Sequence, residues 1–115
     1  MKVSLMMGCL ALPLLVGAKG PRPETPAPRA TGAAIIQENL VFLPGELTVR
    51  QGTRLSFPNR DGVFHSVYCA SGSQTFDLGL HATGPGPTVV LTATGDLEVR
   101  CRVHRRMRAT VHVTH

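Results

Sequence analysis

Short runs of alternating hydrophobic and polar residues dominate the chain from about residue 33 onward. Leu47 and Val49 alternate with polar neighbours, Leu55 and Phe57 do the same, and the chain closes with "ATVHVTH". A period of two is typical of a β-strand with one buried face. No long stretch of the sequence has the 3.6-residue period of an amphipathic helix. The pattern therefore predicts an all-β domain.

Turn residues separate these runs at near-regular spacing. Pro44–Gly45 and Asn59–Gly62 each follow a hydrophobic run, and a further short strand is expected within Phe76–Leu80. Gly95–Asp96 divides "TVVLTAT" from "LEVRCRV" and predicts a hairpin between the two flanking strands. About seven to eight short strands in about 80 residues predict an antiparallel Greek-key β-sandwich.

The N-terminal part of the chain has a different composition. Lys2 precedes a mostly apolar stretch that ends at Ala18, which predicts a secretory signal peptide over residues 1–18. An uncleaved membrane anchor is the alternative, although the stretch is short for a span and Pro13 interrupts it. Export predicts a periplasmic or secreted location.

A proline-rich linker is expected over residues 19–32, followed by the folded domain over residues 33–115. A domain of this size buries limited surface and often needs a disulfide or a metal for stability. Once the signal is removed, Cys69 and Cys101 are the remaining cysteines, so a disulfide between them is one possibility.

The stretch "CRVHRRM" carries the candidate chemistry. It presents a thiol at Cys101, an imidazole at His104 and a thioether at Met107, with two residues between each pair. Copper sites for electron transfer use two imidazoles and a thiolate in a plane, with a weak axial thioether. His65, at the start of a predicted strand, is the candidate for the second imidazole. This donor set disfavours calcium and magnesium and suits copper.

Two segments together resemble the cupredoxins, the small blue-copper proteins: "ENLVFLPGELTVRQGTRLSFPNRDGVFHSV" and "LEVRCRVHRRM". The C-x-x-H-x-x-M loop has the spacing of the amicyanin type, and the first segment is similar to plastocyanin-like domains of the methylamine-utilisation type. The resemblance implies one copper ion with four ligands: His65, Cys101, His104 and Met107. It also implies that the backbone N–H of Ser66 approaches the cysteine sulfur.

By the same resemblance, the protein is expected to be a one-electron carrier with a protein redox partner, and not an enzyme. A periplasmic chaperone or scavenger that holds Cu(I) through the same residues is an alternative. A metal-free sandwich stabilised by a Cys69–Cys101 disulfide is another. If the strand from His65 is regular, Cys69 lies about 13 Å farther along it. A shared metal at His65 and Cys101 and this disulfide therefore exclude each other, and Cys69 is expected to be a buried free thiol.

Five arginines lie in or beside the candidate loop: Arg100, Arg102, Arg105, Arg106 and Arg108. Amicyanin-type loops carry prolines around the second histidine, where this loop has Arg105 and Arg106. The arginines form either a solvated face or a positive rim that steers an acidic redox partner toward His104. Nucleic acid is a poor partner, because an exported domain with one Tyr and no Trp lacks stacking platforms, and no nucleic-acid binding is expected. A monomer without a membrane partner after signal removal is expected.

The remaining histidines have no ligand spacing with one another. We expect His81 in an exposed loop, and His115 is terminal. His112 is expected on the solvent face of its strand if Val111 and Val113 face the core.

Overall fold

The computed structural model describes residues 32–115. The predicted signal peptide and the predicted linker, except for its last residue, lie outside the described residues. Ten strands follow one another: β1 (Gly32–Ala34), β2 (Ile36–Glu38), β3 (Val41–Leu43), β4 (Glu46–Arg50), β5 (Arg54–Ser56), β6 (His65–Cys69), β7 (Phe76–His81), β8 (Thr88–Val90), β9 (Gly95–Cys101) and β10 (Arg108–Thr114). Within this range, no helix has the length and hydrophobicity needed to span a membrane.

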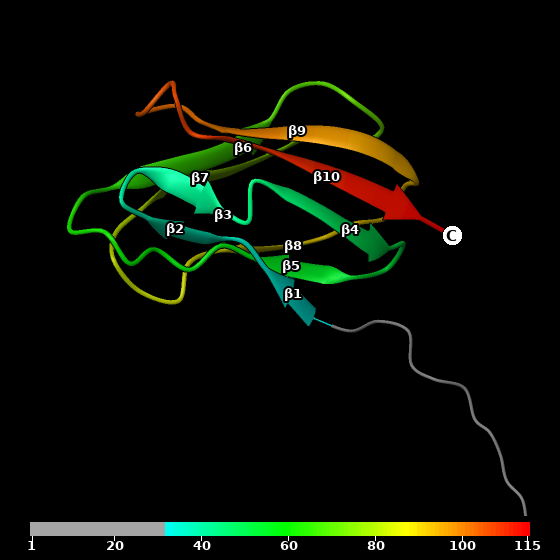
Figure 1. Ribbon diagram of the computed structural model, residues 1–115, viewed down its shortest axis with the longest axis horizontal. Helices are drawn as coiled ribbons and strands as arrows, with labels where there is room; N and C mark the ends of the chain where they lie inside the picture. The colour runs from blue at the N-terminus through cyan, green and yellow to red at the C-terminus, as the bar shows by residue number, and fades with distance from the viewer. Residues whose placement is uncertain (1–31) are drawn as a thin grey trace, which may run out of the picture.

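The strands form two packed sheets and a short hairpin (Figure 1). One sheet has the order β1-β5-β8, and the larger one has the order β4-β10-β9-β6-β7. Strands β2 and β3 form the hairpin. The β-sandwich predicted from the alternating pattern is confirmed. The sheets are mixed rather than wholly antiparallel, because β1 pairs with β5 and β4 pairs with β10 in parallel.

The core lies between the inner faces of the two sheets. Along β9, Leu97, Val99 and Cys101 are buried, while the residues between them are more exposed. Leu55 of β5 is fully buried and belongs to the same hydrophobic cluster. Alternation along each strand thus supplies one apolar face per sheet, as the sequence pattern predicts.

The predicted Gly95–Asp96 hairpin is wrong. Both residues belong to β9, and β8 pairs with β5 in the other sheet, so the chain crosses between the sheets before Gly95. Gly95 serves a close approach instead of a hairpin turn. Its φ is 125°, and a Cβ there would lie 3.0 Å from side-chain atoms of Ser73.

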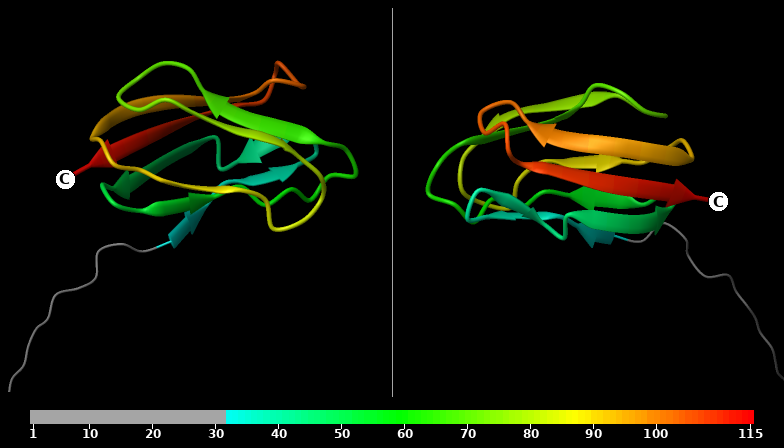
Figure 2. Two further views of the ribbon diagram at one scale, coloured as in Figure 1. Left: turned by 180° about the vertical axis from the view of Figure 1, so that it is seen from behind. Right: turned by 45° about the horizontal axis from the view of Figure 1, so that its top comes forward.

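Three segments meet at the end of the sandwich that lies away from the C-terminus (Figure 2). They are the turn between β2 and β3, the segment that leads into β6, and the loop between β9 and β10. The carboxylate of Asp61 joins the first two, since it accepts hydrogen bonds from the backbone N–H groups of Asn39 and Leu40. We refer to this part of the molecule as the loop end.

On the outer face of the five-stranded sheet, His112 connects three strands. Its side chain lies opposite the core, as predicted, while Val111 and Val113 are buried. Its Nδ1 lies 2.8 Å from an Asp96 oxygen on β9, and its Nε2 lies 2.6 Å from a Glu46 oxygen on β4. The hydrogen bond to Glu46, followed by that to Asp96, raises the pKa of His112 above its ordinary value.

We expect His112→Gln to lower stability in a pH-dependent way. A raised pKa means that the folded chain holds the proton more tightly than the unfolded chain. The contribution is therefore complete below about pH 6.5, the ordinary histidine pKa, and is lost as pH rises through the folded-state pKa. Urea unfolding of both chains should show a midpoint difference at about pH 5.5 that disappears by about pH 9. A difference that is constant across this range would contradict the paired imidazolium.

Leu55→Ala tests the core. The substitution removes a fully buried side chain and leaves a cavity, so the free energy of unfolding should fall by about 2–5 kcal/mol. Leu80→Ala is the matched control, because Leu80 is 64% exposed and its loss should change stability by less than about 0.5 kcal/mol. Equal effects in denaturant unfolding would show that the core is placed wrongly.

Candidate metal centre

His65 is the first residue of β6 and is fully buried. Its Nε2 lies 2.8 Å from an oxygen of Asp61, four residues earlier in the chain. When the ring is neutral and Nε2–H donates a hydrogen bond to this carboxylate, the lone pair of the ring is at Nδ1. The strand position and the acidic partner therefore orient Nδ1 for metal binding before any metal arrives.

Cys101 is the last residue of β9, and two contacts with β6 hold it in place. The N–H of Arg102 donates to the carbonyl oxygen of Ser66 at 2.9 Å, and the N–H of Ser66 approaches the Cys101 sulfur at 3.4 Å. The second contact is the one predicted from the resemblance. This contact between β6 and the end of β9 fixes the position of the sulfur.

The loop from Cys101 to Met107 is closed by its own backbone. The N–H of Met107 donates to the His104 carbonyl at 3.0 Å, and the N–H of Cys101 donates to the Met107 carbonyl at 3.4 Å. These bonds turn the chain tightly enough for His104 to face back toward Cys101. A short loop with few free dihedrals holds its side chains with little added entropy cost.

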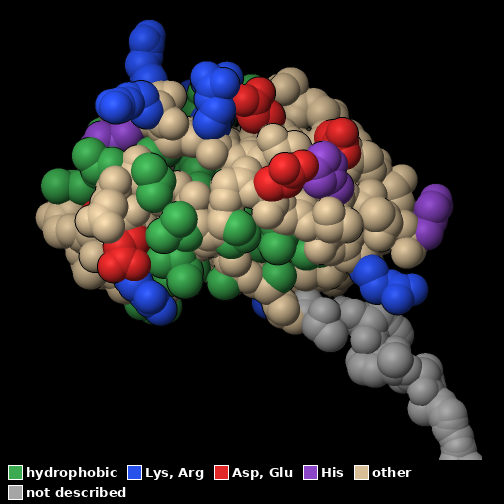
Figure 3. Space-filling view, viewed as in Figure 1, with side chains coloured by type: hydrophobic (Ala, Val, Ile, Leu, Met, Phe, Trp, Pro, Cys, Tyr) green, Lys and Arg blue, Asp and Glu red, His purple; other side chains and the backbone are tan. Residues whose placement is uncertain are grey.

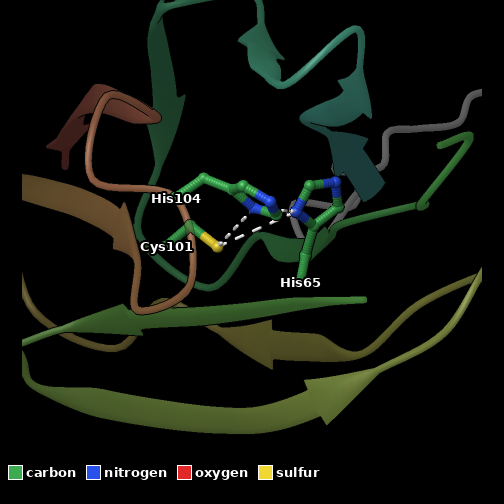
Figure 4. Close-up of side chains that lie close together, drawn as sticks. All are labelled: His65, Cys101 and His104. Atoms are coloured by element: carbon green, nitrogen blue, oxygen red, sulfur yellow. Dashed lines mark hydrogen bonds between the residues drawn. The ribbon is translucent and has the colours of Figure 1, made fainter. Parts of the chain in front are cut away.

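The two imidazoles and the sulfur point toward one another from three places in the fold (Figure 4). The Nδ1 atoms of His65 and His104 are 3.1 Å apart, and each lies 3.8 Å from the Cys101 sulfur. His65 and Cys101 are buried, and His104 is partly exposed.

This spacing fits a trigonal metal site. A first-row ion binds nitrogen at about 2.0 Å and thiolate sulfur at about 2.3 Å. In a trigonal plane these lengths separate two nitrogens by about 3.5 Å and sulfur from nitrogen by about 3.7 Å. The three residues therefore suit copper, both in donor chemistry and in spacing. Two neutral imidazoles and a thiolate have no open oxygen ligands, which is why magnesium and calcium do not fit.

Met107 is 1% exposed and belongs to the hydrophobic core cluster. Its position at the end of the closed loop is compatible with the predicted axial thioether. That role, and the assignment of the four residues as ligands, stays a prediction.

The other candidates lie apart from this group. Cys69 is buried and free, with its thiol directed at the carbonyl oxygens of Ser71 and Gln74, so the alternative of a Cys69–Cys101 disulfide is wrong. The prediction that His81 lies in an exposed loop is also wrong. It is the last residue of β7, only partly exposed, and its Nε2 lies 2.9 Å from the amide nitrogen of buried Gln37.

Asp61 is the residue that the sequence reasoning missed. Burial pushes its pKa upward, but the hydrogen bond from His65 and those from the backbone of Leu40 and Asn39 outweigh it, so the pKa of Asp61 lies below its ordinary value. Asp61 is therefore ionised at neutral pH. Its place in the turn before His65 was the available signal, because a carboxylate four residues from a candidate ligand can orient that ligand.

Comparison with known proteins locates the fold. No family model matches the chain, and no curated protein matches it. Solved structures do match. A reduced tryptophan-to-tyrosine variant of amicyanin is 20% identical, with a TM-score of 0.66, over 71% of this chain and 81% of that one. The Cu(I) form of a methionine-to-alanine variant of amicyanin is 22% identical, with a TM-score of 0.64, over 76% of this chain and 84% of that one.

The fold is that of the amicyanin-like cupredoxins. A third structure, the reduced Cu(I) form at pH 4 of a proline-to-glycine variant of amicyanin, agrees with a TM-score of 0.64 at 19% identity, over 78% of this chain and 86% of that one. The cupredoxin fold recognised from two sequence segments is thus confirmed. At this identity the likeness concerns the fold, and the chemistry of this chain is argued from its own residues.

We expect Asp61→Ala to weaken Cu(I) binding by about 10- to 100-fold, because His65 loses the carboxylate that sets its tautomer and ring orientation. Competition against a coloured Cu(I) chelator measures the affinity. Glu38→Ala is the control, since Glu38 is a partly exposed carboxylate whose ion pair is with Arg60. Equal Cu(I) affinity of the Asp61 variant and the parent chain would refute the positioning role.

Proposed function

We propose that this protein is an exported mononuclear copper protein of the blue, or type 1, class that carries single electrons between redox partners. The supporting observation is the convergence of two histidine Nδ1 atoms and one cysteine sulfur within 3.1–3.8 Å at one end of a cupredoxin fold. The proposed ligands are His65, Cys101, His104 and Met107. Bound copper supplies reversible one-electron chemistry between Cu(I) and Cu(II).

The protein's part in this function is to hold the ligands still. His65 is held by β6 and Asp61, and Cys101 is held by the backbone of β6. These contacts come from the protein and not from the metal. They therefore hold the ligands in nearly the same geometry when the copper changes between Cu(I) and Cu(II). Little reorganisation then accompanies electron transfer, which is the requirement for a fast carrier.

His104 is the ligand nearest to solvent and is the proposed electron port. It lines a hollow together with Leu40 and Val41 of the β2–β3 turn region. Leu40 and Val41 are 45% and 44% exposed. Large exposed apolar side chains that gather at one place indicate an interaction site.

Further exposed hydrophobic residues come from the other two segments of the loop end. Val63 and Phe64 precede β6, and Val103 lies in the Cys101–Met107 loop. Figure 3 shows hydrophobic side chains gathered at this end, with arginine side chains above them. The arginines of the loop therefore leave an apolar surface beside His104.

The backbone of the β2–β3 turn supports this surface. Asn39 and Leu40 have φ values of 58° and 61°, and a non-glycine residue rarely adopts such a conformation. The Asp61 carboxylate stabilises both conformations, because it accepts hydrogen bonds from the backbone N–H groups of the two residues. One side chain thus positions a candidate ligand and presents Leu40 to solvent.

The location, the linker, the partner and the monomeric state in this proposal are argued from the sequence. Residues 1–18 would direct export to the periplasm or outside the cell, and residues 19–32 would separate the domain from that segment. The partner would be a redox protein that approaches His104, and the carrier would act as a monomer.

Cys101→Ser tests the proposal. The copper-loaded parent chain should show an intense visible absorption band that comes from the thiolate–Cu(II) contact, together with the matching spin-resonance signal. The variant should lose that band, because a serine hydroxyl replaces the thiolate. Cys69→Ser is the matched control, since Cys69 is equally buried and free, and should keep the band.

Met107→Leu should keep the band and shift the reduction potential, because the weak axial group is lost while the trigonal plane remains. A parent chain that binds Cu(I) but forms no coloured Cu(II) state would favour copper handling over electron transfer. Retention of the band in Cys101→Ser would refute the ligand assignment.

A further inference from the structure

A basic hollow lies on the outer face of the five-stranded sheet, beside the Cys101–Met107 loop. Its volume is about 560 Å³. The residues that line it are Tyr68, Arg100, Cys101, Arg102, Arg105 and Arg108. The hollow therefore adjoins the backbone of a proposed copper ligand, yet no part of the proposed copper chemistry uses its four arginines.

Strand register builds the floor of this hollow. Tyr68 on β6 is paired with Arg100 on β9, and Arg100 is paired with Arg108 on β10. Two like charges directly opposite each other destabilise a sheet. Glu98 offsets this cost, since its carboxylate lies 3.2 Å from the Arg100 guanidinium and 4.0 Å from that of Arg108.

Arg102 is held at the rim. Its guanidinium lies 4.0 Å from the centre of the Tyr68 ring, and a nitrogen lies 3.0 Å from an oxygen of Asp77. Stacking on an aromatic face and pairing with a carboxylate fix the orientation of an otherwise flexible side chain. A guanidinium that is already ordered loses less entropy when it binds a second group.

The charges around the hollow do not balance. Glu98 and Asp77 serve Arg100, Arg102 and Arg108. Arg105 has no carboxylate partner among the residues that the structure describes. The hollow thus keeps a surplus of positive charge, and guanidinium groups bind carboxylates as paired, charge-assisted hydrogen bonds.

Arg105 also lines the hollow that contains His104, Leu40 and Val41. One residue therefore connects the basic hollow to the apolar surface around the proposed electron port. A partner that places carboxylates in the first hollow would bring its adjoining surface over the second. The single tyrosine is already covered by Arg102, so a nucleic-acid base has no free ring to stack on in this hollow.

We propose that the basic hollow docks an acidic, Asp- or Glu-rich segment of the partner protein, and that Arg105 joins this contact to the surface over His104. The identity of the partner as a redox protein rests on the proposed electron-carrier function. The docking itself rests on the arginines, the register and the charge surplus.

A capped hexaglutamate peptide serves as the probe. It is titrated into the isotope-labelled chain, both without metal and loaded with Cu(I), and backbone amide shifts are followed by NMR. We expect shifts at Tyr68 and along Arg100–Arg108. Binding should weaken strongly between about 10 mM and about 150 mM salt, as the Debye length falls from about 30 Å to about 8 Å.

Arg105→Gln should weaken peptide binding by about two- to fivefold, the range expected for one exposed ion pair. Arg54→Gln is the matched control, because Arg54 is an exposed arginine on β5 in the other sheet, and its loss should leave binding unchanged. Equal affinity of the Arg105 and Arg54 variants would overturn the proposal.

Two further arms exclude other occupants. Inorganic phosphate that produces the same shifts at lower concentration than the peptide would overturn the proposal in favour of a small anion. Sedimentation with anionic phospholipid vesicles, in the absence of peptide binding, would overturn it in favour of a membrane.

A visible copper band in a chain that does not bind the peptide would refute the docking inference while the proposed function stands. Peptide binding by a chain that forms no such band would support the docking inference and refute the proposed electron-carrier function.

Discussion

The close approach of two imidazole nitrogens and one sulfur at one end of the sandwich is the constraint on which the rest of this structure depends. Buried lone-pair groups are costly unless another group orients and compensates them. Each of the three has such support: Asp61 for His65, the Ser66 N–H for Cys101, and the closed backbone of the loop for His104. The strand order places these supports together, because β6 lies directly beside β9.

The loop end combines two surfaces of different character. Exposed hydrophobic residues lie beside His104, and the arginines lie around the end of β9 on the outer face of the larger sheet. On that same face, the carboxylates of Glu46 and Asp96 lie farther along the strands, where both are bound to His112. The positive charge of Arg105, unpaired among the described residues, thus adjoins the proposed copper site, while Glu46 and Asp96 farther along the strands are paired with His112. Such a distribution orients an approaching acidic partner before contact.

Several features of the site could be predicted from short sequence signals. Cys101 and His104 are close in the chain, so a tight loop brings them together in almost any arrangement. His65 was predicted from its place at a strand start, and β6 does begin there. Asp61 could not be predicted with the same force, since its role depends on the β2–β3 turn lying against it. His81 was placed in a loop, because the strand expected within Phe76–Leu80 extends one residue farther, to His81.

The sequence by itself determined the all-β class and the cupredoxin resemblance, and it named all four candidate ligands, because period-two alternation, a strand start and a seven-residue loop are local properties. Only the tertiary structure decided that Cys69 and Cys101 stay apart, that Gly95 begins a strand instead of a hairpin turn, and that one carboxylate links His65 to the turn beside His104. These are contacts between segments distant in the chain. They follow from strand order and register, which local pattern leaves open.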